Sequence, residues 1–150
     1  MMTTTAAVDS LGAAKVIYNL NFEDVLRTAR EVVAENPDYI YIPPFEKDAE
    51  NGTCWYWHDA VPGCIVGHIL NRLGIPKGVT QSREGRPIKG FFTEDSPEGK
   101  ILHGDNQTRM FLGELQGVQD IGKLTWSEAL AKAEYYIEMH AQYAREGALA

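Results

Sequence analysis

The sequence predicts a mainly helical α+β fold, with about four helices and a small antiparallel element of two to four strands. Two long segments repeat apolar residues at helical spacing and begin with residues that cap helices, which indicates amphipathic helices. Short runs rich in aromatic and β-branched residues lie between these segments, and this composition is typical of strands. The order of long helices and short strands gives the fold class.

The amino-terminal residues differ in composition from the rest of the chain. Residues 1–14 are small and polar and lack a periodic apolar pattern, so we expect a flexible tail. Residues 15–150 fit one globular domain, because domains cluster near ~100–150 residues. Of the 150 residues, 44% are hydrophobic and 23% are charged, which is ordinary for a globular protein and excludes disorder throughout.

The first helix is predicted over residues 22–35. Asn21 is a favourable N-cap, and apolar residues follow it at spacings of three and four. Asn36 and Pro37 end the helix, because proline cannot continue the pattern of backbone hydrogen bonds. We expect one face of this helix to lie in the core.

The next part of the chain predicts two extended stretches and a second helix. Residues 39–42 have the composition of a short strand, and residues 53–58 are aromatic-rich and extended. The helix is expected over residues 62–73. Gly74 suits the position after its end, and Pro76 prevents its continuation.

A segment rich in Gly, Pro and charged residues follows the second helix. Within it, residues 87–92 and 100–103 are predicted to pair as a hairpin across the turn-prone residues 94–99. A third helix is predicted over residues 106–119, because large apolar residues share one of its faces.

The last helix is predicted as one continuous element over residues 124–146. Thr125 and Glu128 have the spacing of a capping box, in which each side chain binds the backbone N–H of the other residue. An unbroken apolar stripe follows this box. The residues of the stripe that we expect to be buried are Trp126, Leu130, Ala133 and Ile137.

The formal net charge of −7 arises from 21 acidic and 14 basic residues. It disfavours contact with nucleic acid and with anionic membranes. No apolar run approaches the ~18 residues of a membrane-spanning helix, and no secretory signal is recognisable. Two cysteines do not make the disulfide framework of a small secreted domain. We therefore expect a cytoplasmic protein in which both cysteines are free thiols.

Residues 54–68 contain both cysteines and two of the four histidines. The candidate zinc ligands are Cys54, His58, Cys64 and His68, since zinc binds thiolates and imidazoles in a tetrahedron. Cys64 and His68 are neighbours at i and i+4 on the predicted helix. Cys54 and His58 would lie roughly 13 Å apart on an extended strand, so a shared zinc ion requires a turn between them.

Two other interpretations of the cysteines stay open. Cys64 lies in the first turn of the predicted helix, where the helix dipole favours a thiolate, and a nearby histidine could serve as the base of a catalytic cysteine. No oxyanion-hole motif or third orienting residue accompanies it. The simpler interpretation is that Cys54 and Cys64 are small buried hydrophobic residues.

The pattern around the second helix also predicts a binding surface. On a helical wheel, Cys64 and His68 lie opposite the main apolar stripe. The two tryptophans of the preceding strand share one side, which we expect to face the core, so that Tyr56 and His58 face outward. The predicted binding surface consists of Tyr56, His58, Cys64 and His68.

Several short motifs carry a resemblance to a known group of proteins. They are Cys-Trp-Tyr-Trp-His-Asp at residues 54–59, Gly-Cys-Ile-Val-Gly-His-Ile-Leu at residues 63–70 and Thr-Trp-Ser-Glu-Ala at residues 125–129. Over about residues 53–133 the chain resembles small uncharacterised proteins of actinobacteria and actinobacterial phages. The resemblance implies an accessory protein in a bacterial cytoplasm and carries over no catalytic residue.

We therefore expect a non-enzymatic accessory or regulatory protein that acts by protein–protein interaction in a bacterial cytoplasm, with a phage genome as one source. Its partner is expected to be another protein rather than a membrane or a nucleic acid, and no cofactor is expected. Two alternatives stay open. One is a small zinc- or thiol-dependent domain that uses the cysteines and histidines of residues 54–68. The other is an enzyme whose active site is assembled from scattered residues.

Overall fold

The computed structural model describes residues 2–8, 12, 14–44, 54–81, 84–92 and 102–149, and it confirms a mainly helical α+β fold. The helices of the described residues are α1 (Phe22–Glu35), α3 (Ile65–Arg72), α4 (Lys77–Gln81), α5 (Asn106–Gly122), α6 (Trp126–Leu149) and the short 3-10 helix η1 (Ile88–Phe92). The strands are β1 (Thr3–Val8), β2 (Ala14–Asn19), β3 (Trp57–His58), β4 (Val61–Pro62) and β5 (Leu102–His103).

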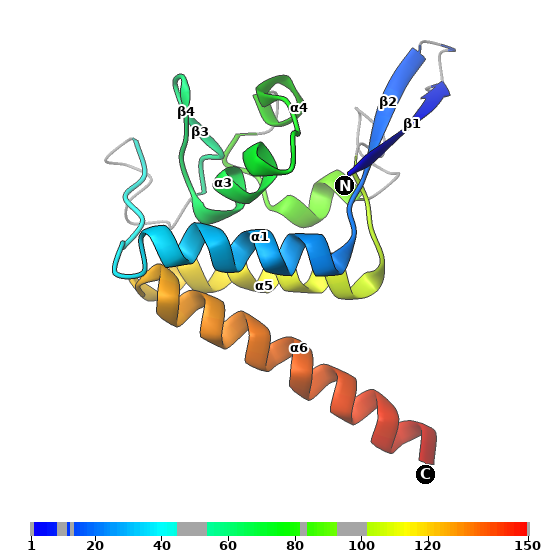
Figure 1. The fold of residues 1–150 in the computed structure, drawn as a ribbon, viewed down its shortest axis with the longest axis vertical. Coiled ribbons are helices and arrows are strands. Elements are labelled where there is room, and N and C mark those ends of the chain that lie inside the picture. Colours follow the sequence, from blue (N-terminus) through cyan, green and yellow to red (C-terminus); the bar gives the residue numbers. More distant parts are fainter. Residues whose placement is uncertain are drawn as a thin grey trace.

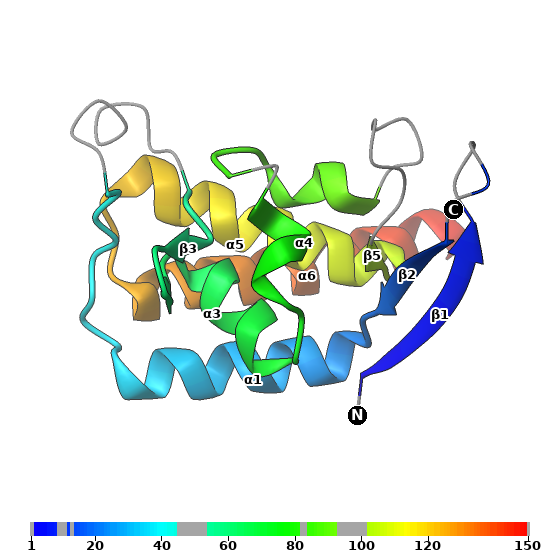
Figure 2. The same cartoon turned by 90° about the horizontal axis from the view of Figure 1, so that it is seen from above.

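The helices form three layers (Figure 1). Helices α1 and α5 lie side by side in the middle layer, and α6 crosses one face of this pair. Helices α3 and α4, η1 and the β3–β4 hairpin cover the opposite face, with α3 above α1 and α5 (Figure 2). The core fills the space between the layers. Fully buried side chains from four helices meet there, among them Val25, Ile69, Phe111, Leu115 and Trp126.

A three-stranded sheet lies at one end of the molecule, with strand order β1-β2-β5. Strands β1 and β2 are antiparallel, with Thr3 opposite Asn19, whereas β2 and β5 are parallel. Strand β1 lies within residues 1–14, which we expected to form a tail. Threonine favours strands. However, residues 3–6 and 8 are all exposed, so these residues of β1 bury no apolar face that an alternating sequence pattern would reveal.

The predicted hairpin of residues 87–92 and 100–103 is wrong. Residues 88–92 form η1, because Ile88, Phe91 and Phe92 bury apolar side chains at spacings of three and four, which is a helical period. Leu102 pairs instead with Tyr18 of β2. Residues 94–99, the predicted turn, lie outside the described residues. Of the predicted strand at 39–42, Ile40 forms one isolated antiparallel bridge with Thr125.

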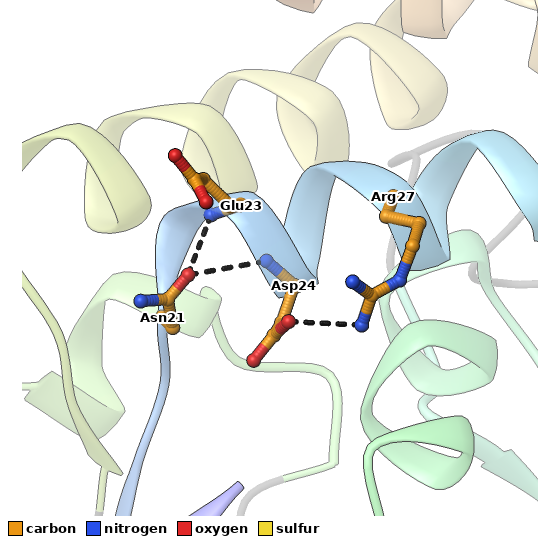
Figure 3. A network of polar contacts seen from close by, with 4 residues as sticks. All are labelled: Asn21, Glu23, Asp24 and Arg27. Carbon is orange, nitrogen blue, oxygen red and sulfur yellow. Dashed lines mark hydrogen bonds and ion pairs between the residues drawn. The ribbon is translucent and has the colours of Figure 1, made fainter. Parts of the chain in front are cut away.

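Helix α1 starts and ends as predicted. The side-chain oxygen of Asn21 accepts hydrogen bonds from the backbone N–H groups of Glu23 at 2.9 Å and Asp24 at 3.3 Å (Figure 3). These bonds satisfy two of the N–H groups that have no partner within the helix. Asp24 also forms an ion pair with Arg27, one turn further along, at 2.8 Å.

Helix α3 begins at Ile65, three residues later than predicted, because Pro62 belongs to strand β4. Its end matches the prediction. Gly74 follows the helix with φ +89°, and the N–H of Ile75 bonds to the carbonyl of Leu70 at 3.0 Å. This is a Schellman motif, in which glycine accepts the left-handed conformation without a steric penalty.

Helix α6 is the continuous helix that the sequence predicts. Thr125 and Glu128 form the capping box, and each side chain binds the other residue's backbone N–H at 3.1 Å. Trp126, Leu130, Ala133 and Ile137 are all buried, as expected. Helix α5 begins at its N-cap Asp105, which accepts a hydrogen bond from the N–H of Thr108 at 2.8 Å.

Candidate binding groove

Cys54 and Cys64 form a disulfide, so the prediction that both are free thiols is wrong. The β3–β4 hairpin turns the chain back on itself, and the N–H of Cys64 bonds to the carbonyl of Trp55 at 2.9 Å. This pairing brings the two cysteine Cα atoms to 5.7 Å, within the range that a disulfide spans. Both side chains are buried, at 3% and 0% exposure.

The expectation that Tyr56 faces outward is also wrong, because its side chain is fully buried. Its hydroxyl donates to the carbonyl of Arg86 at 2.5 Å and accepts from the side-chain amide of Gln116 at 2.9 Å. The side-chain oxygen of Gln116 accepts from the N–H of Ile88 at 2.7 Å. The phenol of Tyr56 is therefore buried without an unpaired polar group.

A second buried glutamine joins three helices. The side-chain oxygen of Gln119 on α5 accepts from the N–H of Ile65, the first residue of α3, at 2.8 Å. The same oxygen accepts from the indole N–H of Trp126, the first residue of α6, at 3.0 Å. Gln119 therefore supplies the cap of α3 that Cys64, the residue at the N-cap position, does not provide.

His58 and His68 are half-buried in different surroundings. The Nε2 atom of His58 lies 3.1 Å from the hydroxyl of Tyr41, and the ring of His68 packs edge-on against Trp126 at 5.2 Å. Burial lowers the pKa of both imidazoles, so both are neutral at pH 7. Burial of the Tyr41 phenol raises its pKa, so it also stays neutral.

The four residues of the predicted binding surface therefore do not share one exposed face, since Tyr56 and Cys64 lie in the core. In the disulfide form, neither cysteine is a thiolate that could attack a substrate or bind zinc. Among the residues that the structure describes, no group of three or more His, Cys, Asp or Glu side chains is arranged to hold a metal ion.

The two tryptophans that flank Tyr56 in the sequence line an open groove. Trp55 and Trp57 are half-buried, and β3 stands on the same side of the molecule as α4 (Figure 1). The groove has a volume of about 420 Å³. It is lined by Trp55, Trp57, Asp59, Lys77, Gln81 and Glu84, and we call it the tryptophan groove.

Glu84 fixes the backbone beneath the groove. Its two carboxylate oxygens accept from the N–H groups of Tyr56 at 3.1 Å and Trp57 at 3.0 Å. The pKa of Glu84 is raised because burial is the largest effect on it. The two hydrogen bonds and the charge of Lys77 act in the opposite direction. The backbone of residues 55–57 is thus bonded both to Glu84 and to residues 63 and 64.

Lys77, the first residue of α4, connects this helix to the β3–β4 hairpin. Its ammonium group donates to the backbone carbonyl of Asp59 and lies 5.8 Å from the centre of the Trp57 ring. Asp59 occupies the turn between β3 and β4 with φ +57°, a left-handed conformation in which aspartate and asparagine are enriched. Asp59 is therefore an exposed residue that lines the groove at this turn.

Sequence reasoning missed the groove because the strand was assigned the wrong buried side. The sequence does hold a signal, since Gln116 and Gln119 follow Leu112 at spacings of four and seven on the apolar face of α5. Amides on a buried face require polar partners, and Tyr56 is such a partner. Asp59, Gln81 and Glu84 carry no comparable signal, because they meet only through the tertiary fold.

No family model, no curated protein and no solved structure matches this chain. None of the helices in the described part of the chain is both long enough and apolar enough to span a bilayer.

Proposed function

We propose that the protein is a non-enzymatic accessory or regulatory protein that binds another protein through the tryptophan groove. The observation that carries this proposal is the pair of half-buried tryptophans that line one groove on a hydrogen-bonded backbone. Tryptophan is enriched at the centres of protein interfaces, because its large ring buries much apolar area at a small entropic cost. The backbone N–H of Trp57 is bonded to Glu84 and that of Trp55 to the hydroxyl of Tyr41 at 2.9 Å, so the surface is preorganised for a partner.

The polar residues around the tryptophans support the same proposal. Asp59 and Gln81 are exposed at the edge of the groove. Polar side chains beside exposed aromatic area are the usual composition of a protein interface. The open shape of the groove suits an extended segment of a partner better than a small molecule, which needs an enclosed cavity.

A displayed library of random twelve-residue peptides tests this proposal. We expect the wild-type protein to select peptides, Trp57→Ala to lose them, and Tyr143→Ala to keep them, since Tyr143 is 66% exposed on the distant helix α6. Gln81→Tyr should also lose the peptides, because it obstructs the groove from an exposed position without removing a packed ring. A library that yields no peptide dependent on Trp57 would refute the proposed function.

We further propose that the protein acts in a bacterial cytoplasm, without a cofactor, as an accessory protein of an actinobacterium or its phage. The resemblance over residues 53–133 supports the source. Disulfides are rare in the cytoplasm, and the burial of Cys54 and Cys64 offers the protection from reductants that this one would need there. Acid quenching of producing cells, alkylation of thiols after denaturation and mass spectrometry should find both cysteines unmodified. Two alkylated cysteines would mean that the bond is absent in that compartment.

A further inference from the structure

The lining of the tryptophan groove indicates the chemistry of its occupant. We propose that the groove binds a basic side chain, arginine or lysine, of the partner protein, and that Lys77 occupies the place of this side chain in the free protein. The inference rests on the proposed function, because it names what the groove recognises. Its structural basis is the pair of contacts that Lys77 makes with the Trp57 ring and with the backbone carbonyl of Asp59.

Lys77 shows that the groove accommodates a cation. Its ammonium group lies 5.8 Å from the centre of the Trp57 ring, within the ~6 Å over which an indole attracts a positive charge. The backbone carbonyl of Asp59 accepts a hydrogen bond from the same group. An incoming guanidinium or ammonium group would find the same ring face and the same acceptor.

The charges that line the groove favour a second cation over an anion. Asp59 and Glu84 contribute two carboxylates, whereas Lys77 contributes a single ammonium group. Glu84 is engaged with two backbone N–H groups, but the carboxylate of Asp59 is exposed. The net charge of −7 on the whole chain adds a long-range attraction for basic partners.

The same charges disfavour a nucleic acid as the occupant. Bases could stack on the two tryptophans, as they do on aromatic residues in single-strand-binding proteins. Their phosphates would then lie beside Asp59 and Glu84, where such proteins place lysine or arginine. A peptide with a basic side chain would instead contact both the tryptophan rings and the carboxylates of Asp59 and Glu84.

A pair of matched small probes tests the charge requirement. Acetyl-argininamide and acetyl-citrullinamide have the same shape, but only the first carries a positive charge. We expect acetyl-argininamide to shift the indole N–H signals of Trp55 and Trp57 in NMR spectra, with an affinity at least about threefold higher than that of acetyl-citrullinamide. Equal affinities, or competition by a decathymidylate that binds more tightly, would overturn the proposal.

Two substitutions test the roles of the lining residues. Lys77→Met keeps the apolar stem and removes the internal cation, so it should raise the affinity for acetyl-argininamide about two- to fivefold, a range typical of one exposed charge. Lys132→Met, on α6, is the matched control and should change nothing. A lower affinity in Lys77→Met would show that Lys77 recruits the occupant rather than standing in for it, and would overturn the proposal.

Asp59→Asn should weaken binding of acetyl-argininamide about two- to fivefold. Asparagine tolerates the left-handed conformation at this position, so the turn is preserved and the melting temperature should not move. Asp38→Asn, at an exposed carboxylate that does not line the groove, is the control. Unchanged affinity in Asp59→Asn would contradict the proposed recognition of charge.

The peptide library separates this inference from the proposed function. Selected peptides that depend on Trp57 should contain arginine or lysine more often than the starting library. Peptides that depend on Trp57 but lack this enrichment would leave the interaction function standing and refute the recognition of a basic side chain. A library without any peptide dependent on Trp57 would refute the proposed function itself.

Discussion

Gly67 lies at the closest approach between α3 and the strand that carries the tryptophans. A Cβ atom added at this position would lie 2.0 Å from the backbone oxygen of Tyr56, and backbone cannot move aside as a flexible side chain can. At Gly117, inside α5, an added Cβ would meet no atom within 4 Å. Both glycines lie within helices, but only Gly67 allows a close approach of another segment, whereas the space around Gly117 would admit a side chain.

We expect Gly67→Ala to destabilise the protein by about 2–3 kcal/mol, because the overlap forces backbone shifts. Gly117→Ala should stabilise it by about 0.5–1 kcal/mol, because alanine loses less conformational entropy in a helix. Urea denaturation of both variants measures the difference. A Gly67→Ala variant as stable as Gly117→Ala would show that α3 and the strand are not in contact.

The buried side-chain oxygen of Gln119 on α5 accepts hydrogen bonds from the first residues of both α3 and α6. Replacement by leucine would leave the N–H of Ile65 and the indole N–H of Trp126 without their acceptor. Each unpaired buried group costs about 1–3 kcal/mol, so the two groups together should cost Gln119→Leu about 2–6 kcal/mol of unfolding free energy. Gln142→Leu, at an exposed position on α6, should change stability by less than about 0.5 kcal/mol. Equal effects of the two changes would contradict the buried network.

Asp120 should make stability fall as the pH rises. Burial raises the pKa of this carboxyl from 3.8 to about 7, although a hydrogen bond from Gln119 opposes the shift. Between about pH 4 and 7 the unfolded chain releases the proton of Asp120 and the folded chain retains it. Asp120 therefore favours unfolding progressively as the pH rises through this window, by at most about 1.4 kcal/mol per pH unit.

Asp120→Asn isolates this contribution, because the amide oxygen can still accept from Gln119 but does not titrate. We expect the variant to gain stability relative to the wild type between pH 4 and 7, with the gain complete above pH 7. Urea denaturation at a series of pH values measures it, with Asp38→Asn as the exposed control. A constant difference between wild type and Asp120→Asn across this range would show that Asp120 titrates normally.

At the scale of elements, the sequence predicted what local chemistry determines. The N-cap Asn21, the capping box at Thr125 and the glycine that follows α3 set helix ends through contacts between near neighbours. Strand partners are not local. Leu102 pairs with Tyr18, 84 residues away by number (102 − 18), and nothing within either short stretch specifies the other. The buried side of the β3 segment was missed for the same reason, since it depends on Gln116 of α5.

The disulfide joins the segment before the β3–β4 hairpin to Cys64, the residue at the N-cap position of α3. Replacing both cysteines by alanine should cost about 2–4 kcal/mol, because the unfolded chain regains the freedom of the closed loop. A reductant that reaches the bond should lower the stability of the wild type by a similar amount and leave the double variant unchanged. Two thiols titrated in freshly purified, unreduced protein would contradict the bond.

At the scale of the whole molecule, β3 and α4, which carry residues of the tryptophan groove, lie on the opposite side of the α1–α5 layer from α6 (Figure 1). The amino-terminal half of α6 packs on that layer, and Ile137 is its last buried residue among those described. The remainder extends beyond α1 and α5, and residues 142–147 are exposed. These residues therefore contribute little to the core and nothing to the groove.

A chain that ends after Gln142 should keep its unfolding free energy within about 0.5 kcal/mol of the full-length value, since it removes no buried side chain that the structure describes. Its affinity for acetyl-argininamide should also be unchanged. A chain that ends after Ala133 is the matched control. It removes Ile137, which is 7% exposed, and should lose at least about 2 kcal/mol. If the chain that ends after Gln142 were destabilised as much as the chain that ends after Ala133, the end of α6 would have to pack on α1 and α5, contrary to the layered arrangement. If it weakened binding at the groove, the two faces would be coupled across the α1–α5 layer.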